Sequence, residues 1–199
     1  MRGRLIVLEG GEASGKSTQA RLLATDLGAV LTHEPGGTPA GRRVREVVLD
    51  PAVGELSPRA EALLMAADRA EHVAEVIAPA LARGDDVVSD RFTPSSLAYQ
   101  GYGRGLDLGE LRRLSSWASA GLEADLVILL EVPDNVARQR RGGRPDRMEA
   151  EDAAFHRRVA DGYRRLAAAE PDRWVVVDGT GPIDAVAARV RDAVGAVIR

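Results

Sequence analysis

One eight-residue segment constrains the fold of this chain more than any other. Residues 10–17 read Gly-Gly-Glu-Ala-Ser-Gly-Lys-Ser, which matches the pattern GxxxxGK[ST]. The segment lies between a β-rich run at 5–9 and a helical stretch at 16–26. A glycine-rich loop in that position presents several backbone N–H groups, together with the positive end of a helix dipole, to a phosphate. The segment therefore predicts a phosphate-binding loop (P-loop) near the start of an α/β domain.

Position 16 differs from the rest of the chain in its choice of basic residue. The 199 residues include 27 lysines and arginines, and Lys16 is the sole lysine among them. In a loop of this type the lysine reaches the β and γ phosphates of a nucleotide, and the hydroxyl of Ser17 is a ligand for Mg²⁺. We therefore interpret residues 10–17 as a site for nucleoside triphosphate.

Short β-rich runs alternate with helical stretches along the chain. The expected strands cover residues 5–9, 29–33, 86–90, 126–132 and 174–178. The expected helices cover residues 16–26, 40–49, 58–83, 107–120, 135–141, 151–169 and 182–198. Apolar runs without polar alternation are typical of strands that are buried on both faces. This order predicts a single α/β domain over residues 1–199, with a five-stranded parallel sheet and helices on both faces.

Glycine and proline predict where several of these helices end. Gly28, Gly84 and Gly121 follow helical stretches at positions where a left-handed cap is expected. Pro79 lies inside the long third stretch, where it is expected to kink or end the helix because it lacks a backbone N–H.

Composition excludes several classes of protein. The chain has no cysteine, which excludes disulfides, thiolate catalysis and cysteine-based metal centres. A formal charge of −3, with only two Trp, three Tyr and two Phe, argues against a nucleic-acid partner. No apolar run approaches the roughly 18 residues of a membrane span, and the first ten residues do not resemble a signal peptide. We expect a cytoplasmic protein with small-molecule partners and no membrane partner.

Two segments beyond the loop also contain candidate binding residues. Asp90 and Arg91 end the third expected strand, where a P-loop protein needs a ligand for magnesium or water. Arg91 could hold a second phosphate bidentately, which indicates two phosphorylated ligands. Residues 34–38, Glu-Pro-Gly-Gly-Thr, follow the second strand at the edge where open α/β sheets bind ligands. The helix that follows begins with three arginines, of which one is expected to face inward.

An arginine-rich segment covers residues 138–149. Its five arginines, separated by a Gly-Gly pair and a proline, are Arg138, Arg140, Arg141, Arg144 and Arg147. In a chain with net negative charge, such a cluster predicts a short lid that closes over polyphosphate. For any single arginine, a solvated position in a charged loop is the alternative.

Taken in order, these motifs resemble those of the thymidylate kinase family over essentially the whole chain. The resemblance rests on the loop at 9–16, the Glu-Pro-Gly-Gly-Thr segment at 34–38, the Asp-Arg-Phe segment with Ser-Ser and Ala-Tyr-Gln-Gly at 90–101, and Asp-Arg-Met-Glu at 146–149. It implies the P-loop nucleoside-monophosphate-kinase fold. It also implies transfer of the γ-phosphoryl group of ATP to dTMP with Mg²⁺ in a homodimer, which yields dTDP.

The resemblance further implies roles for matching residues. It assigns the ATP phosphates to Gly10, Gly11, Glu12, Ala13, Ser14, Gly15, Lys16, Ser17 and Thr18, and the metal to Ser17 and Asp90. It assigns dTMP to Glu12, Glu34, Pro35, Arg45, Met65, Arg69, Arg91, Ser95, Ser96, Tyr99 and Gln100. Among these, Glu12 corresponds to the carboxylate that holds the 3′-hydroxyl, and Arg45 and Arg91 to the clamp on the acceptor phosphate. Arg69, Ser96 and Gln100 correspond to residues that read the thymine edge, and Tyr99 to the ring that excludes a 2′-hydroxyl.

Two departures from the family pattern, and one feature that matches its bacterial branch, affect these assignments. The P-loop contains no arginine, so Arg138, Arg141, Arg144 or Arg147 is expected to supply catalytic charge beside Lys16 and Arg91, as in the bacterial branch of the family. His33 stands where the family usually has arginine. Met65 stands where the family has the aromatic residue that stacks on thymine, and a thioether offers less area to a base.

Two alternatives remain open at the level of sequence. The chain could be another P-loop kinase that acts on a small molecule or a nucleoside monophosphate, such as a guanylate, adenylate or shikimate kinase. It could also be a P-loop ATPase that acts as a switch for a partner protein. A GTPase is excluded because the guanine motif Asn-Lys-x-Asp requires a second lysine.

Overall fold

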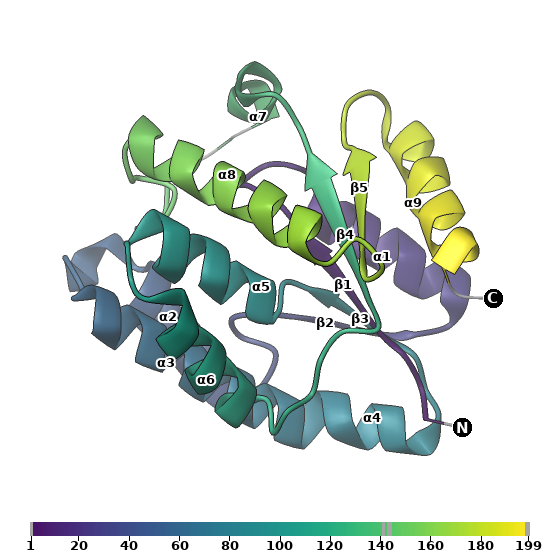
Figure 1. Ribbon diagram of the computed structural model, residues 1–199, viewed down its shortest axis with the longest axis horizontal. Coiled ribbons are helices and arrows are strands. Elements are labelled where there is room, and N and C mark those ends of the chain that lie inside the picture. Colours follow the sequence, from purple (N-terminus) through teal and green to yellow (C-terminus); the bar gives the residue numbers. More distant parts are fainter. Residues whose placement is uncertain (1, 141, 143–144, 198–199) are drawn as a thin grey trace.

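The structure is a computed structural model that describes residues 2–140, 142 and 145–197. Five parallel strands form its sheet in the order β2-β3-β1-β4-β5 (Figure 1). Their bounds are β1 (Leu5–Glu9), β2 (Val30–His33), β3 (Val87–Asp90), β4 (Leu126–Glu131) and β5 (Trp174–Asp178). The predicted five-stranded parallel sheet is confirmed, and the observed strand bounds lie within one residue of the expected ones.

Helices cover both faces of the sheet (Figure 1). Ile6 and Leu8 of β1 face α1 (Lys16–Leu27) and α9 (Ile183–Val197), whereas Leu5 and Val7 face the other layer. That layer contains α3 (Pro58–His72), α6 (Leu108–Ala118) and α8 (Ala153–Ala169), and α2 (Pro39–Leu49) packs against α3. Burial on both faces explains why the strands are continuous apolar runs.

Pro79 does not end the third expected helix. The chain passes from α3 into a π-helical turn, η2 (Val73–Ile77), and then into α4 (Ala78–Arg83), which Gly84 closes at a φ of 90°. The widened turn ends at Ile77, two residues before Pro79, so the helix changes its hydrogen-bonding register close to the missing proline N–H and continues past it. The predicted left-handed caps are confirmed at Gly28 and Gly84, and Gly121 also has a positive φ.

Residues 93–103 form a helix that the sequence pattern did not predict. It consists of α5 (Thr93–Ser96) and a π-helical segment, η3 (Leu97–Gly103). A Cβ on Gly103 would lie 2.7 Å from a ring carbon of Phe155, and one on Gly162 would lie 2.5 Å from Tyr102. These glycines let η3 pack directly against α8. Small residues that resemble helix breakers in the sequence therefore permit close packing between two helices.

The order of the strands creates a crevice at one edge of the sheet. The chain passes from β1 to β2 and β3 on one side, and then to β4 and β5 on the other. Open α/β sheets bind ligands at such a reversal, outside the carboxyl ends of the strands. Two short elements complete the described chain, η1 (Pro51–Val53) after α2 and α7 (Asp134–Arg140) after β4. Within the described residues, no helix combines the length and apolar character that crossing a bilayer requires.

Candidate active site

The P-loop joins β1 to α1 and has the backbone geometry that its glycines permit. Gly10 has a φ of 144° and Gly15 a φ of 98°, both in the region that favours glycine. The Lys16 Nζ atom donates hydrogen bonds to the Gly11 carbonyl oxygen at 2.7 Å and to Ser14 Oγ at 3.4 Å. Burial, aided by the nearby charge of Arg91, lowers the pKa of Lys16 to about 8. The loop thus curves around the ammonium group that is expected to contact phosphate.

Ser17 and Asp90 meet where β3 ends beside the P-loop. Ser17 Oγ donates a hydrogen bond to Asp90 Oδ2 at 2.5 Å, and the buried Asp90 Oδ1 has no hydrogen-bond partner among the described residues. A carboxylate and a hydroxyl are hard oxygen ligands of the kind Mg²⁺ prefers. Within residues 2–140, 142 and 145–197, no three acidic or histidine side chains form a metal cage. Mg²⁺ usually binds through one or two carboxylates and substrate phosphates, so this pair fits that ion.

Arg91 lies at the centre of the site. Its NH1 atom donates to the Gly10 carbonyl at 3.3 Å, to Ser95 Oγ at 3.1 Å and to the Tyr163 hydroxyl at 3.1 Å. Its NH2 atom donates to Glu12 Oε1 at 2.6 Å and to the Tyr99 hydroxyl at 3.2 Å. The guanidinium group also lies over the Tyr99 ring, 5.0 Å from its centroid. These contacts fix both ends of the guanidinium fork between the P-loop and η3.

Two carboxylates flank Arg91, one partly exposed and one fully buried, and their pKa values are shifted in opposite directions. Burial alone would raise the pKa of Glu12, but Arg91, Lys16 and a hydrogen bond from Tyr99 outweigh it and hold that pKa at about 2. Glu9 is fully buried, and burial raises its pKa. Glu9 accepts hydrogen bonds from the Phe92 and Ser95 backbones, Ser95 Oγ and the Tyr163 hydroxyl. Glu9 therefore holds the turn that carries Arg91, while Glu12 faces the cavity as a carboxylate.

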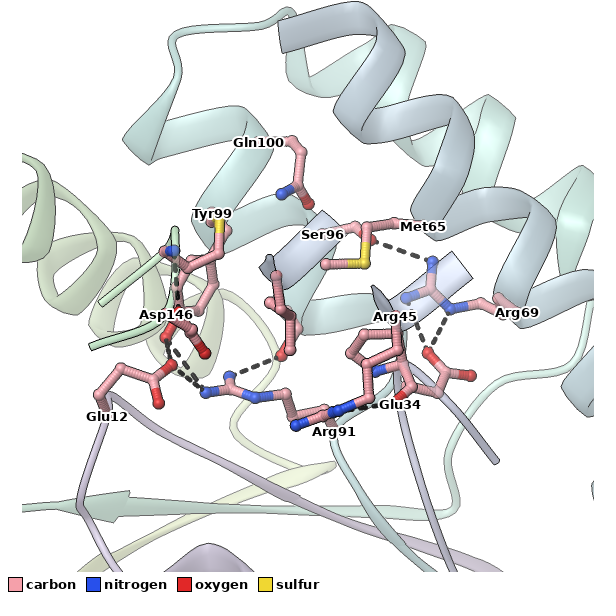
Figure 2. A pocket seen from close by; sticks show the side chains of 14 residues that line it. Glu12, Glu34, Arg45, Met65, Arg69, Arg91, Ser96, Tyr99, Gln100 and Asp146 are labelled. Atoms are coloured by element: carbon pink, nitrogen blue, oxygen red, sulfur yellow. Dashed lines mark hydrogen bonds and ion pairs between the residues drawn. The ribbon is translucent and has the colours of Figure 1, made fainter. Parts of the chain in front are cut away.

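Two cavities meet at this arginine. The first contains every residue assigned to dTMP by resemblance and also Leu49, Asp146 and Met148 (Figure 2). The second lies beside the P-loop and includes Lys16, Ser17, Thr18, His33 and Asp90. Four residues line both cavities: Glu12, Glu34, Arg45 and Arg91. A ligand at the P-loop and a ligand in the first cavity can therefore meet across the same charged groups.

The Glu-Pro-Gly-Gly-Thr segment forms one wall of the first cavity through a buried ion-pair network. Glu34 accepts a hydrogen bond from Arg69 Nε at 2.9 Å and contacts His72 Nδ1 at 3.0 Å. Arg69 also donates to Ser96 Oγ at 3.1 Å, as Figure 2 shows. Arg45 NH1 donates to the Pro35 carbonyl at 2.9 Å. Of the three arginines in α2, Arg45 is the one that lines the cavity, as the sequence analysis expected of one of them.

The end of the first cavity away from Arg91 is less charged. Figure 2 shows Met65 and Gln100 at that end, with Glu12 and Arg91 at the other. Leu49 and Met148 add apolar surface. Tyr99 donates its hydroxyl hydrogen to Glu12 Oε1 at 2.6 Å, so its ring stands between the two ends. The cavity therefore has a charged end suited to a phosphate and an end suited to a planar base.

The lid arginines occupy different environments. Arg138 is exposed and donates only to the Asp134 carbonyl among its described contacts. Arg147 donates to the Val48 carbonyl of α2 at 2.7 Å and to Glu61 Oε2 of α3 at 2.6 Å. Arg141 and Arg144 lie outside the described residues.

Sequence reasoning missed three residues that support the site. Arg140, which belonged to the lid cluster but received no catalytic role, donates to the Ser14 carbonyl at 3.4 Å and to the Gly179 carbonyl at 3.0 Å. Glu9 and Tyr163 hold Ser95 beside Arg91. Glu9 carried a signal, since it is an acidic residue at the end of a buried strand. Tyr163 carried none, because its helix lies 72 residues beyond Arg91.

Comparison with known proteins gives one consistent result. The family model described as thymidylate kinase matches residues 8–190. A thymidylate kinase of Leifsonia xyli subsp. xyli is 53% identical, over 95% of this chain and 93% of the relative. One of Deinococcus radiodurans is 50% identical, over 97% of both chains. The crystal structure of thymidylate kinase from Ehrlichia chaffeensis has a TM-score of 0.81 at 30% identity, covering 96% of this chain and 98% of that chain.

Proposed function

The chain belongs to the thymidylate kinase family, and from that premise we propose how its own residues perform the family's reaction. The enzyme transfers the γ-phosphoryl group of ATP to dTMP, which yields dTDP for nucleotide biosynthesis. Residues 10–18 bind the ATP phosphates, and the first cavity binds dTMP with its phosphate at the Arg91 end. The alternatives of a different acceptor or a switch protein are not favoured, because relatives at about 50% identity over most of the chain are thymidylate kinases.

One observation carries this assignment of residues. Arg91 lines both cavities, and each of its two terminal nitrogens donates a hydrogen bond to a P-loop residue, NH1 to Gly10 and NH2 to Glu12. An in-line transfer requires donor and acceptor phosphates to meet with their charges neutralised. A planar guanidinium group suits this position because it binds phosphate oxygens bidentately.

The mechanism needs positioning and charge neutralisation rather than a general base. The attacking atom is an oxygen of the dTMP phosphate, which is already ionised at neutral pH. Lys16 neutralises charge on the β and γ phosphates, and Arg91 with Arg45 holds the acceptor phosphate. Glu12 remains ionised because its pKa is held at about 2, so it accepts a hydrogen bond from the sugar 3′-hydroxyl. The Tyr99 ring occupies the space that a 2′-hydroxyl would need.

Mg²⁺ and the lid complete the proposal. Ser17 and Asp90 would hold the ion, which supplies positive charge to the ATP phosphates. The segment 138–149 closes over the donor and excludes water, with its arginines adding charge to the transferred group. The contacts of Arg140 with the P-loop and Gly179 support a position of this segment against the donor site. Residues 1–199 then act as one kinase domain with this segment as its lid.

A homodimer and a cytoplasmic location are further parts of the proposal. Val47, Leu63 and Trp117 are exposed apolar side chains on α2, α3 and α6. Trp117 is 82% exposed and Leu63 58%. The three helices pack in series, α2 against α3 and α3 against α6, so their outer surface supports pairing with a second copy. The use of ATP as donor supports the cytoplasm as the compartment.

An acceptor screen tests the reaction. Purified protein is incubated with ATP and Mg²⁺ and with dTMP, dUMP, AMP, GMP or shikimate, and ADP release and product masses are measured. We expect efficient formation of dTDP, weaker use of dUMP and negligible use of the other acceptors. Phosphorylation of another acceptor in preference to dTMP, or ATP hydrolysis without transfer, would contradict the proposal.

A further inference from the structure

Glu61 of α3 is a buried carboxylate that the mechanism above does not use. It has no exposed surface. Its Oε1 atom accepts hydrogen bonds from Gln100 Nε2 at 2.8 Å and from Arg104 Nε at 3.3 Å. Its Oε2 atom accepts from Arg104 NH2 at 3.0 Å and from Arg147 NH2 at 2.6 Å. Both carboxylate oxygens are therefore occupied by donors from η3, its C-terminal flank and the lid segment.

Glu61 can act only as an acceptor. Burial alone would raise its pKa, but the hydrogen bonds from Arg104, Gln100 and Arg147 outweigh burial and lower it. An ionised carboxylate has no proton to donate. Gln100, in contrast, has a donor end and an acceptor end on the same carboxamide. Beside Glu61, the side chain of Gln100 must therefore present its NH₂ group to the carboxylate.

This contact decides which end of Gln100 faces the substrate cavity. Gln100 is 1% exposed and lines the cavity close to Met65. Figure 2 shows its carboxamide directed toward the cavity, with the nitrogen and the oxygen on opposite sides. Gln100 donates one N–H to Glu61, and this orientation places its carbonyl oxygen on the opposite side of the carboxamide, where a ligand can reach it. The cavity thus offers a hydrogen-bond acceptor at this point.

We infer that Glu61 is a specificity-determining positioning residue, which holds Gln100 so that the cavity accepts a hydrogen bond from a base that carries an imide N–H. The inference rests on the proposed function and deepens it. Thymine and uracil have this N–H at N3, whereas cytosine has a lone pair there, which would face the Gln100 oxygen without a proton between them. A site built to hydrogen-bond a substrate N–H can reject an analogue that lacks it by about 10⁴-fold.

A glutamine at position 61 would remove this constraint. Its carboxamide can pair with that of Gln100 in either orientation, because each has both a donor and an acceptor. Gln100 could then turn its NH₂ group toward the base. Arg104 would keep Glu151 as an ion-pair partner at 2.6 Å, and Arg147 would keep its hydrogen bond to the Val48 carbonyl. The Glu61→Gln change therefore acts mainly on the orientation of Gln100.

The test compares kcat/KM for dTMP and dCMP in a set of variants. We expect Glu61→Gln to lower the dTMP-to-dCMP ratio of kcat/KM at least tenfold, chiefly through a higher KM for dTMP. Glu151→Gln is the matched control, since Glu151 shares Arg104 with Glu61 but makes no described contact with Gln100. Its ratio should stay within twofold of the wild type. In a Gln100→Ala background, Glu61→Gln should cause no further change in the ratio, because the residue through which it acts is gone.

Two further measurements keep the inference falsifiable if Glu61→Gln folds poorly. Glu61→Asp preserves the charge for both arginines but shortens the reach to Gln100, and it should lower the ratio to an intermediate degree. The unaltered protein should reject N3-methyl-dTMP, which lacks the N–H, by at least a hundredfold relative to dTMP. Equal use of N3-methyl-dTMP and dTMP, or an unchanged ratio in a folded Glu61 variant, overturns the inference. Absence of dTMP phosphorylation in the wild type would instead refute the proposed function.

Discussion

Replacement of Arg91 by lysine separates the charge of this residue from its geometry. Arg91 has a φ of 77°, a left-handed conformation that is unfavourable for any residue with a Cβ. Arg91→Lys retains that backbone cost and the positive charge. A comparison of this variant with the wild type therefore measures the contribution of the two-nitrogen geometry of the guanidinium group. The guanidinium group makes hydrogen bonds through two nitrogens, to Gly10, Ser95 and Tyr163 on one side and to Glu12 and Tyr99 on the other. A single ammonium nitrogen cannot occupy both positions.

The expected loss follows from the number of positioned donors. Removing one preorganised donor from a site of developing charge costs about 10²–10³ in rate, or about 3–4 kcal/mol. Lysine keeps the charge, so we expect Arg91→Lys to lose about 10²-fold in kcat/KM for dTMP and Arg91→Ala at least about 10³-fold. The fold should tolerate the change. Ser95 and Tyr163 still donate to Glu9, at 2.6 and 2.8 Å, and Tyr99 still donates to Glu12.

A coupled assay for ADP release, with ATP and Mg²⁺ at saturation and dTMP varied, gives kcat and KM for each variant. Urea unfolding of the same samples measures the free energy of unfolding as the control. If Arg91→Lys stays folded and its kcat/KM remains within about threefold of the wild type, the two-sided fork is not what aligns the phosphates, and the assignment of Arg91 is wrong.

Three other predictions follow from the charges and the surface. Burial holds the pKa of Lys16 at about 8 before nucleotide binds, and the negative phosphates should raise that pKa. ATP binding at pH 8 should therefore be accompanied by uptake of about half a proton. Calorimetry in buffers of different ionisation enthalpy measures this uptake, and Lys16→Met should abolish it. Burial and the neighbouring Glu34 raise the pKa of Asp68 from 3.8 to about 6, which favours its neutral form in the folded state. The contribution of Asp68 to stability should therefore be greatest below pH 4 and fall by up to about 3 kcal/mol as the pH rises through 6. Urea unfolding at pH 4 and 8 should show that Asp68→Asn removes this part of the pH dependence, and an unchanged difference would contradict it. If the face around Trp117 joins two copies, Trp117→Glu should convert a dimer to a monomer in sedimentation experiments, whereas Val176→Glu, on β5, should not.

Much of the fold could be predicted because its signals are local. The strands are short apolar runs, the P-loop needs glycine at particular backbone conformations, and Gly28 and Gly84 end their helices in the left-handed region. The helix at 93–103 could not be predicted in this way. Its glycines lower helix propensity, and their advantage appears only when Phe155 packs against Gly103. The effect of Pro79 also depended on a change of helical register that no local rule indicates.

The candidate site likewise has parts that the sequence predicts and parts that it does not. Motif spacing was enough to name the P-loop and the Asp90-Arg91 pair, because each lies next to the end of a strand. Resemblance to the family, rather than spacing, supplied the residues assigned to dTMP, which line the first cavity. Motif spacing was not enough to rank the arginines of the lid. Arg140 and Arg147 are seven positions apart in one charged segment, yet one contacts the P-loop and the other a carboxylate on α3.

By itself, then, the sequence determined the class of fold and predicted where phosphate binds and which side chains are available there, since these depend on backbone conformation and on neighbours a few residues apart. Only the tertiary structure decided which polar groups are partners and which way each one points. Glu61 and Gln100 are 39 residues apart and meet through the packing of α3 against η3. A buried carboxylate must be satisfied by whichever donors packing brings to it, and that requirement, rather than any pattern in the chain, orients the groups that face the substrate.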